Sequence, residues 1–281
     1  MKRLLWIILL MSVFVSAKAG QYSNTGFADY LFYQGDYYRA IGEYKRYIYS
    51  NEKSSNIETA YFMIAKSYLL ANKTEQAREA FDYIVQNYEG EYVKKSVIGK
   101  ILSLSMGEEY EYSNILCKTH SEILDISQSA YLQGINYLSL NDWVGSKIEF
   151  EKVQKENELY NSASEMVKYL EGYGGVPQKS EILAGILGAV LPGSGYLYCE
   201  RYADSLVAFT INAILAYNLY NSINNHDTTG TVLYGISGAV MYTTNITGGI
   251  TAAGKFNRDK KEEFKKNALE LKVDLIKFFL P

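Results

Sequence analysis

The sequence predicts an all-α protein in three parts: a solenoid of helical repeats, a helical-hairpin membrane domain, and a C-terminal amphipathic helix. Three observations support this prediction. A pattern of small and aromatic residues recurs about every 34 residues in the first half. Long uncharged runs occupy most of the second half. The chain of 281 residues has only 3 prolines, which suits helices because proline interrupts them.

The N-terminal segment has the pattern of a signal peptide. Two basic residues precede an apolar run from Leu4 to Val15, and the motif Ala17-Lys18-Ala19 follows. This order predicts a signal peptide over residues 1–19 with cleavage before Gly20. An uncleaved N-terminal anchor is the alternative. The formal net charge of −3 gives no basic stripe for nucleic acid, so we expect no nucleic-acid partner.

Export would bring the chain into an oxidising compartment, yet it has only two cysteines, Cys117 and Cys199. They lie in different halves of the sequence. The favoured interpretation is two unpaired structural cysteines, and a disulfide between them is the alternative.

Four segments of the first half, starting at Phe27, Ile64, Ile98 and Gln133, share a pattern. A small residue comes second in each: Ala28, Ala65, Gly99 and Gly134. A turn residue follows seven positions later in three of them: Gly35, Asn72 and Asn141. Then come a small residue and, four positions on, an aromatic one: Ala40 with Tyr44, Ala77 with Phe81, and Ser146 with Phe150. Small residues allow two helices to cross closely, and a glycine or asparagine allows the backbone to reverse.

This pattern resembles the tetratricopeptide repeat, a helix-turn-helix unit of about 34 residues. The resemblance covers Gln21–Leu159, and we assign residues 20–173 to the repeats, with a capping helix over Tyr160–Tyr173. The third repeat departs from the pattern because Gly107 comes one residue late and Tyr112 replaces the small residue. The proline that usually ends a repeat is missing throughout.

The resemblance implies a groove, lined by the first helix of each repeat, that binds a peptide or another protein. By matching repeat positions, its surface would include Asp29, Phe32, Tyr33, Phe62, Lys66, Leu69, Tyr131 and Leu138. The alternative is that many of these aromatic residues pack between helices. The 27 tyrosines also raise the possibility of a carbohydrate platform. Large helix-packing positions with hydroxyls reaching water are the simpler explanation for them.

The second half has the composition of a membrane domain. We expect a linker over residues 174–181 and a glycine-rich membrane domain over 182–254, which contains long runs without charged residues. The polar residues in these runs, such as Asn212 and Asn245, should face one another or water. Gly235 and Gly238 lie on a small-residue face that would let helices approach closely. A buried hairpin in a soluble domain is the alternative.

The first apolar run, Ile182–Leu191, is too short to span a bilayer and ends at Pro192. It is compatible with a half-helix, a re-entrant loop, or a span completed through Tyr198. The Gly-Ser-Gly that follows lacks the Lys-Ser/Thr ending and the preceding strand of a phosphate loop.

This region is similar to a group of uncharacterised bacterial membrane proteins with a P-G-x-G-Q-x-Y-x-G-R-Y signature followed by two hydrophobic helices. The resemblance covers residues 183–258, and Tyr196 and Glu200 replace the usual Gln and Gly. It implies a membrane-domain motif and a lipid contact, and says nothing of chemistry. The matching positions are Pro192, Gly193, Gly195, Tyr198, Arg201 and Tyr202.

Residues 255–281 form a basic tail whose apolar residues, from Phe264 to Phe278, fit one face of a single amphipathic helix. Such a helix lies on a membrane surface or docks on the repeats. Basic residues after Gly254 place this end in the cytoplasm by the positive-inside tendency. Three crossings would satisfy that tendency if the repeats are exported, whereas two crossings and a re-entrant turn would leave the tail outside.

No catalytic, metal-binding or cofactor-binding pattern stands out. The histidines are limited to His120 and His226, and there is no HExxH motif or Cys/His cluster. The acidic group around Glu109 suits a solvated repeat end better than a general acid and base. We therefore expect a non-enzymatic scaffold at the bacterial cell envelope, with the repeats on the periplasmic or extracytoplasmic side. An envelope-assembly or transport accessory whose membrane hairpin is the active part is the alternative.

Overall fold

The computed structural model describes residues 25–51 and 56–281, and every regular element in this part of the chain is a helix. The predicted all-α class is therefore confirmed for the described residues. The predicted signal peptide, residues 1–19, lies outside them. The chain divides into two compact units. The repeat unit comprises the described residues up to Met166 together with Lys272–Pro281, and the hairpin unit is Val167–Leu271.

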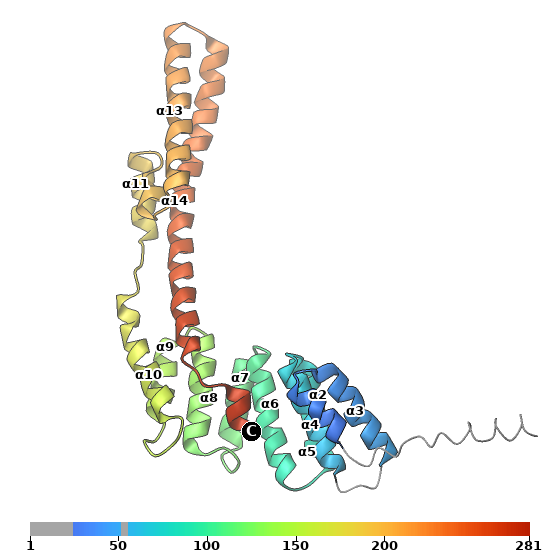
Figure 1. The fold of residues 1–281 in the computed structure, drawn as a ribbon. Helices are drawn as coiled ribbons and strands as arrows, with labels where there is room; N and C mark the ends of the chain where they lie inside the picture. The colour runs from blue at the N-terminus through green and yellow to red at the C-terminus, as the bar shows by residue number, and fades with distance from the viewer. Residues whose placement is uncertain (1–24, 52–55) are drawn as a thin grey trace, which may run out of the picture. The chain divides into compact units, whose positions relative to one another are not determined.

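Helices α2 to α9 of the repeat unit follow one another as pairs (Figure 1). The first helices of the pairs are α2 (Gly26–Tyr33), α4 (Ile57–Leu70), α6 (Glu91–Met106) and α8 (Ile126–Ser139). The second helices are α3 (Tyr37–Ser50), α5 (Thr74–Asn87), α7 (Tyr110–Thr119) and α9 (Trp143–Glu151). Helix α10 (Tyr160–Glu171) comes next, followed by a 3-10 turn over Gly172–Gly175.

The turn inside each pair contains one residue in the left-handed backbone region. These residues are Gly35 (φ 78°), Asn72 (φ 57°), Glu108 (φ 66°) and Asn141 (φ 63°). Glycine adopts this conformation freely and asparagine tolerates it, but glutamate is strained there. The turn residues predicted for the first, second and fourth repeats therefore have the conformation that their chemistry favours.

The third repeat keeps the pattern of the others, shifted by two residues relative to Gly99. Its turn residue is Glu108, and the small residue five positions later is the buried Ser113. The hydroxyl of Ser113 donates to the carbonyl of Ile101 at 3.2 Å, as that of Ser146 donates to Gly134 at 2.9 Å in the fourth repeat. Tyr112, which the sequence pattern placed at the crossing, is exposed. Two extra residues between Gly99 and the turn explain this departure.

Side chains at the repeat turns stabilise the helix starts. The carboxylates of Asp36 and Asp142 accept hydrogen bonds from the amides of Arg39 and Gly145, and so cap α3 and α9. A carboxylate in this position satisfies a backbone amide that has no partner within the helix. These acidic residues therefore have a structural use in the fold.

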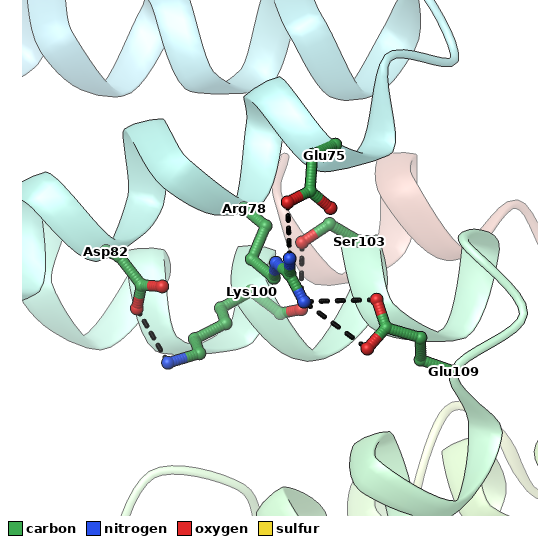
Figure 2. Close-up of polar contacts among 6 residues, drawn as sticks. All are labelled: Glu75, Arg78, Asp82, Lys100, Ser103 and Glu109. Atoms are coloured by element: carbon green, nitrogen blue, oxygen red, sulfur yellow. Dashed lines mark hydrogen bonds and ion pairs between the residues drawn. The ribbon is translucent and has the colours of Figure 1, made fainter.

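Ion pairs link α5 to the end of α6 and the turn after it (Figure 2). The Arg78 guanidinium pairs with Glu75 and, at 3.1 Å, with Glu109, which directly precedes α7. Lys100 pairs with Asp82 at 2.6 Å. Partly exposed pairs of this kind contribute little stability each, so they orient the third repeat more than they stabilise it.

The hairpin unit contains a long antiparallel pair of helices (Figure 1). Its helices after α10 are α11 (Glu181–Val190), α12 (Ser194–Tyr198), α13 (Tyr202–Asn224) and α14 (Thr228–Glu270). Among the described residues, α13 alone is long and apolar enough to cross a membrane by length and composition, with a mean hydropathy of 1.3. Its 23 residues would extend about 35 Å, against a hydrocarbon core of about 30 Å.

The predicted amphipathic tail helix is wrong as a single element. Helix α14 runs through Gly254 to Glu270, and the chain then turns before the short helix α15 (Leu275–Phe279). Asp274 accepts a hydrogen bond from the Lys277 amide at 3.0 Å and so starts the new helix. Because of this break, the buried residues of the last segment are Leu275, Phe279 and Leu280.

Candidate functional site

The segment Lys272–Pro281, called the tail segment below, lies on the first helices of the repeats. The main-chain amide of Val273 donates to the hydroxyl of Tyr131 in α8 at 3.1 Å. Helix α15 packs against α6 (Figure 1). The Lys66 ammonium in α4 donates to the main-chain oxygen of Pro281 at 3.2 Å. The tail segment thus contacts α8, α6 and α4 in turn. It is docked on the repeats.

A cavity of about 340 Å³ remains beside the end of the tail segment. We call the repeat residues around this cavity, together with Tyr131 at the other end of the tail segment, the repeat groove. The repeat residues around the cavity are Phe32, Tyr33, Tyr37, Lys66 and Leu70. The tail residues around it are Asp274, Ile276, Lys277, Leu280 and Pro281. The tail segment therefore leaves part of the groove unfilled.

Lys66 is the charged residue of the repeat groove. Its ammonium lies 5.6 Å from the centre of the Phe32 ring, a cation–π distance. Partial burial, and then the nearby charge of Lys95, lower the pKa of Lys66. No side-chain carboxylate pairs with Lys66 among the residues that the structure describes, whereas Lys95 pairs with Glu91 at 2.7 Å. Lys66 is therefore suited to bind a carbonyl or an anionic group of a ligand.

Tyr131 anchors the other end of the groove. Its ring is fully buried and packs edge-on against Phe150 at 5.4 Å between centroids. Its hydroxyl is shared between Ser162 at 2.7 Å and the amide of Val273. Burial raises the pKa of Tyr131, so the hydroxyl stays protonated at neutral pH. This residue therefore combines a packing function with a polar contact to the tail segment.

The other predicted groove residues point into the repeats. Leu69 and Leu138 are fully buried. The ring of Phe62 packs against Phe81 and Tyr92, at 6.0 and 5.2 Å between centroids. Asp29 accepts hydrogen bonds from the hydroxyls of Thr25 and Tyr44, at 2.8 and 2.6 Å. The structure thus brings four of the predicted residues to the tail segment: Phe32, Tyr33, Lys66 and Tyr131. The other four, Asp29, Phe62, Leu69 and Leu138, contribute to packing within the repeats.

Two groove residues, Tyr37 and Leu70, were not among the predicted set. Tyr37 opens the second helix of the first repeat, and Leu70 ends α4. The prediction included only residues from the first helix of each repeat. Tyr37 belongs to a second helix and was therefore not considered. The edge-on contact of Tyr37 with Phe32, at 5.6 Å, places it at the cavity.

In the hairpin unit, the turn between α11 and α12 is held by one buried amide. The Asn245 side chain in α14 donates to the carbonyl of Gly188 at 2.9 Å and accepts from the amide of Gly193 at 2.7 Å. Both contacts are buried. Asn245 thus satisfies two backbone groups where Pro192 interrupts the helix. Buried backbone groups without such a partner would destabilise the turn.

Gly193 and Gly195 of this turn require glycine for different structural reasons. Gly193 has φ 90°, and a side chain there would meet the carbonyl of Ser205. A side chain on Gly195 would run into the backbone of Ala184 and Gly249. The backbones of α11, α12 and α14 therefore approach each other closely, as helices do where small residues meet.

The rest of the predicted motif lies on the surface around this turn. The Tyr198 hydroxyl accepts from the amide of Ser180 at 3.1 Å, and the Lys179 ammonium lies 5.0 Å from the ring centre. Arg201 pairs with Asp204 at 2.6 Å and lies over the Tyr196 ring. Tyr202 begins α13 and is exposed. These residues fix the connection into α13 and form no recognisable catalytic arrangement.

The small-residue face of α14 does not form a close helix contact. A side chain on Gly238 would meet nothing within 4 Å. A cavity of about 470 Å³ lies there instead, lined mainly by apolar residues of α13 and α14, with Asn212 at its wall. The amides of Asn212 and Asn218 donate to carbonyls in their own helix, at 2.8 and 3.0 Å. Asn212 and Asn218 thus bond within α13, and of these three asparagines Asn245 is the one that bonds across helices.

Within the described ranges, no three His, Cys, Asp or Glu side chains come together as a metal site. Cys117 and Cys199 are buried free thiols. Burial raises the pKa of Cys117 to about 12, so it is a poor nucleophile at neutral pH.

With this geometry established, the sequence was compared with known proteins. Residues 59–90 match the family model of the tetratricopeptide repeat. This stretch contains most of α4 and all of α5, the second helical pair, which provides Lys66 and Leu70. Searches of curated proteins and of solved structures gave no match. The helical-repeat architecture and this match together support the resemblance stated from the sequence for the first part of the chain. Such repeats are typically protein-binding scaffolds without catalysis.

Proposed function

We propose that this protein is an exported, membrane-tethered scaffold that binds a protein partner through the repeat groove at the bacterial cell envelope. The observation that supports the proposal best is the repeat groove itself. It combines an incompletely filled cavity, lined by apolar, aromatic and polar residues, with Lys66, a partly buried cation that has no side-chain carboxylate partner among the described residues. A concave pocket with apolar and aromatic walls and a few oriented polar groups is typical of a ligand-binding site.

The hairpin unit supports the membrane part of the proposal. Apolar side chains along α13, such as Leu206 and Tyr217, are exposed, and only 11% of its most apolar window is buried. A helix of this length and composition suits a lipid environment. The repeats would lie outside the cytoplasm, as the signal-peptide pattern predicts. Lipid would then be the second partner of the chain.

The first test is recovery of the partner from native membranes by crosslinking and pull-down with the full chain. Lys66→Glu should reduce the recovered partner at least several-fold, because it removes the cation of the groove. Lys94→Glu makes the same charge change on the exposed surface of α6 and is the matched control. Equal recovery with both variants would contradict a partner site in the repeat groove.

A second test addresses the membrane and the topology. The protein should stay in the membrane fraction after a carbonate wash, and release would contradict the tether. A cysteine placed by Lys266→Cys, in a chain without the two natural cysteines, reports the side of the basic segment. Labelling from outside the cell would contradict the three-crossing arrangement.

The alternative function, an envelope-assembly or transport accessory, has its own observation. The cavity of about 470 Å³ between α13 and α14 has mostly apolar walls that could receive an acyl chain. Gly238→Leu would fill this space without touching the repeats. If this variant loses the cellular function while Lys66→Glu keeps it, the hairpin is the active part.

A further inference from the structure

We propose that the repeat groove is a receptor for short apolar helices, and that the tail segment occupies it as an intramolecular competitor of the partner. This inference rests on the proposed function and specifies the ligand. The ligand class is a helical peptide with apolar side chains at positions i, i+4 and i+5, followed by a backbone oxygen for Lys66. Leu275, Phe279 and Leu280 of the tail segment have this spacing.

The first argument is that the tail segment contacts the repeats as a bound peptide does. Leu275, Phe279 and Leu280 are buried, whereas Lys272 and Lys277 on the same segment are exposed. Backbone contacts hold both ends, through the Val273 amide on Tyr131 and the Pro281 oxygen on Lys66. Apolar anchors on one side of a short helix are typical of helix-in-groove recognition.

The second argument is that the first repeat closes its own core without the tail segment. The cluster formed by α2, α3 and α4 contains nine buried side chains, and no residue of 272–281 is among them. That cluster comprises Ala28, Leu31, Phe32, Ala40, Ile41, Tyr44, Tyr47, Ala60 and Ile64. The core formed by α2, α3 and α4 therefore does not include the tail segment, which suits a reversible occupant at this end of the groove.

The third argument is the imperfect fit. The cavity of about 340 Å³ at the Lys66 end is bordered by Phe32, Tyr33 and Leu70, which leaves apolar surface that the tail segment does not cover. A partner with a bulkier side chain there would gain contacts that the tail segment lacks. A tethered ligand has an effective concentration of millimolar order. The tail segment can therefore exclude partners of lower affinity from the groove even if its own affinity is low. The arrangement therefore selects for partners that fit the cavity better.

The test uses the detergent-purified full chain and a fluorescent synthetic peptide, KVDLIKFFLP, amidated at its C-terminal end. Fluorescence polarisation measures its Kd for wild type and for the double variant Leu275→Asp with Phe279→Asp, which removes the tail segment from the groove. We expect the double variant to bind the peptide at least 10-fold more tightly than wild type does. A peptide with aspartate at the two anchor positions controls for binding to detergent.

Two further variants identify the site. Added to the double variant, Lys66→Glu should weaken peptide binding about 10-fold, since charge-assisted hydrogen bonds are the strong ones. Lys94→Glu in the same background should leave it unchanged. A chain ended after Leu271 repeats the measurement if the double variant does not fold, as judged by circular dichroism.

Peptide affinity that is equal in wild type and in the undocked variants would overturn the inference. So would equal losses with Lys66→Glu and Lys94→Glu. If wild type is a dimer that the double variant converts into monomers, the tail segment docks between copies, and the intramolecular part is wrong. A failed peptide experiment beside a Lys66-dependent partner pull-down would overturn this inference alone and leave the proposed function in place.

Discussion

The two units of this chain are both helical but are packed by opposite means. Among the residues that the structure describes, the largest fully buried side chains, such as Tyr44, Phe81 and Phe150, belong to the repeat unit. The core of the hairpin unit consists of small residues, Ala184, Cys199, Ala252 and Ala253. Large apolar side chains of α13 and α14 point outward instead. The proposed membrane tether would require this difference, since burial of apolar surface drives packing in water and not in lipid.

Deleting the same aromatic ring from each unit gives the largest expected difference. Phe150→Ala removes a buried ring from the fourth repeat, and we expect the free energy of unfolding of the repeat unit to fall by about 3–5 kcal/mol. Phe209→Ala removes a ring that is 47% exposed in α13 and should cost less than 1 kcal/mol in detergent. Urea unfolding followed by circular dichroism measures both. Equal losses would break the comparison between the units.

The next effect concerns a buried polar residue of the hairpin unit, Asn245. Asn245→Ala leaves the Gly193 amide and the Gly188 carbonyl buried without a partner. Each such group costs about 1–3 kcal/mol, so we expect a loss of about 2–4 kcal/mol. Asn218→Ala is the matched control, because that amide is exposed and bonds its own helix. Thermal unfolding in detergent should lower the Tm of the first variant only.

Replacing a glycine by alanine should change stability in opposite directions in the two units. In the repeat unit, a side chain on Gly134 would lie 2.8 Å from the Phe150 ring, and Gly134→Ala should destabilise by about 1–3 kcal/mol. In the hairpin unit, Gly238 borders open space, and Gly238→Ala should stabilise α14 by about 0.5–1 kcal/mol through helix propensity. A loss of stability from Gly238→Ala would show that the helices close over the cavity.

The sequence predicted those features that local spacing determines. The recurrence of Gly99 and Gly134, with turns at Asn72 and Asn141, was enough to predict the helical pairs, because crossing and reversal depend on residues close in the chain. The uncharged run of α13 predicted a helix long enough to cross a bilayer for the same reason. The match of residues 59–90 to the tetratricopeptide repeat falls on the segment where this spacing is regular.

Features that depend on distant contacts were not predictable. Asn245 and Asn218 have the same chemistry in similar runs, and only the distant turn at Gly193 distinguishes Asn245. Apolar residues from Phe264 onward fit both a membrane surface and the repeats. The tail segment docks on the repeats because it contacts Tyr131 and Lys66, which lie more than 140 residues earlier in the chain. Amphipathicity describes a face without describing what covers it.

The smallest effect tests the third repeat, whose turn comes two residues later after Gly99 than the pattern predicts. Glu108 has a left-handed backbone with φ 66°, a conformation that costs a side-chain-bearing residue about 1–2 kcal/mol. Glu108→Gly removes this strain but increases the entropy of the unfolded chain, so we expect a net gain of about 0.5–1 kcal/mol. Asn141→Gly, at the equivalent position of the fourth repeat, should be close to neutral because asparagine tolerates the conformation. Urea unfolding measures the difference between the two. If both substitutions have the same effect, the strain at Glu108 is relieved by its neighbours, and the shifted register is then as stable as the regular one.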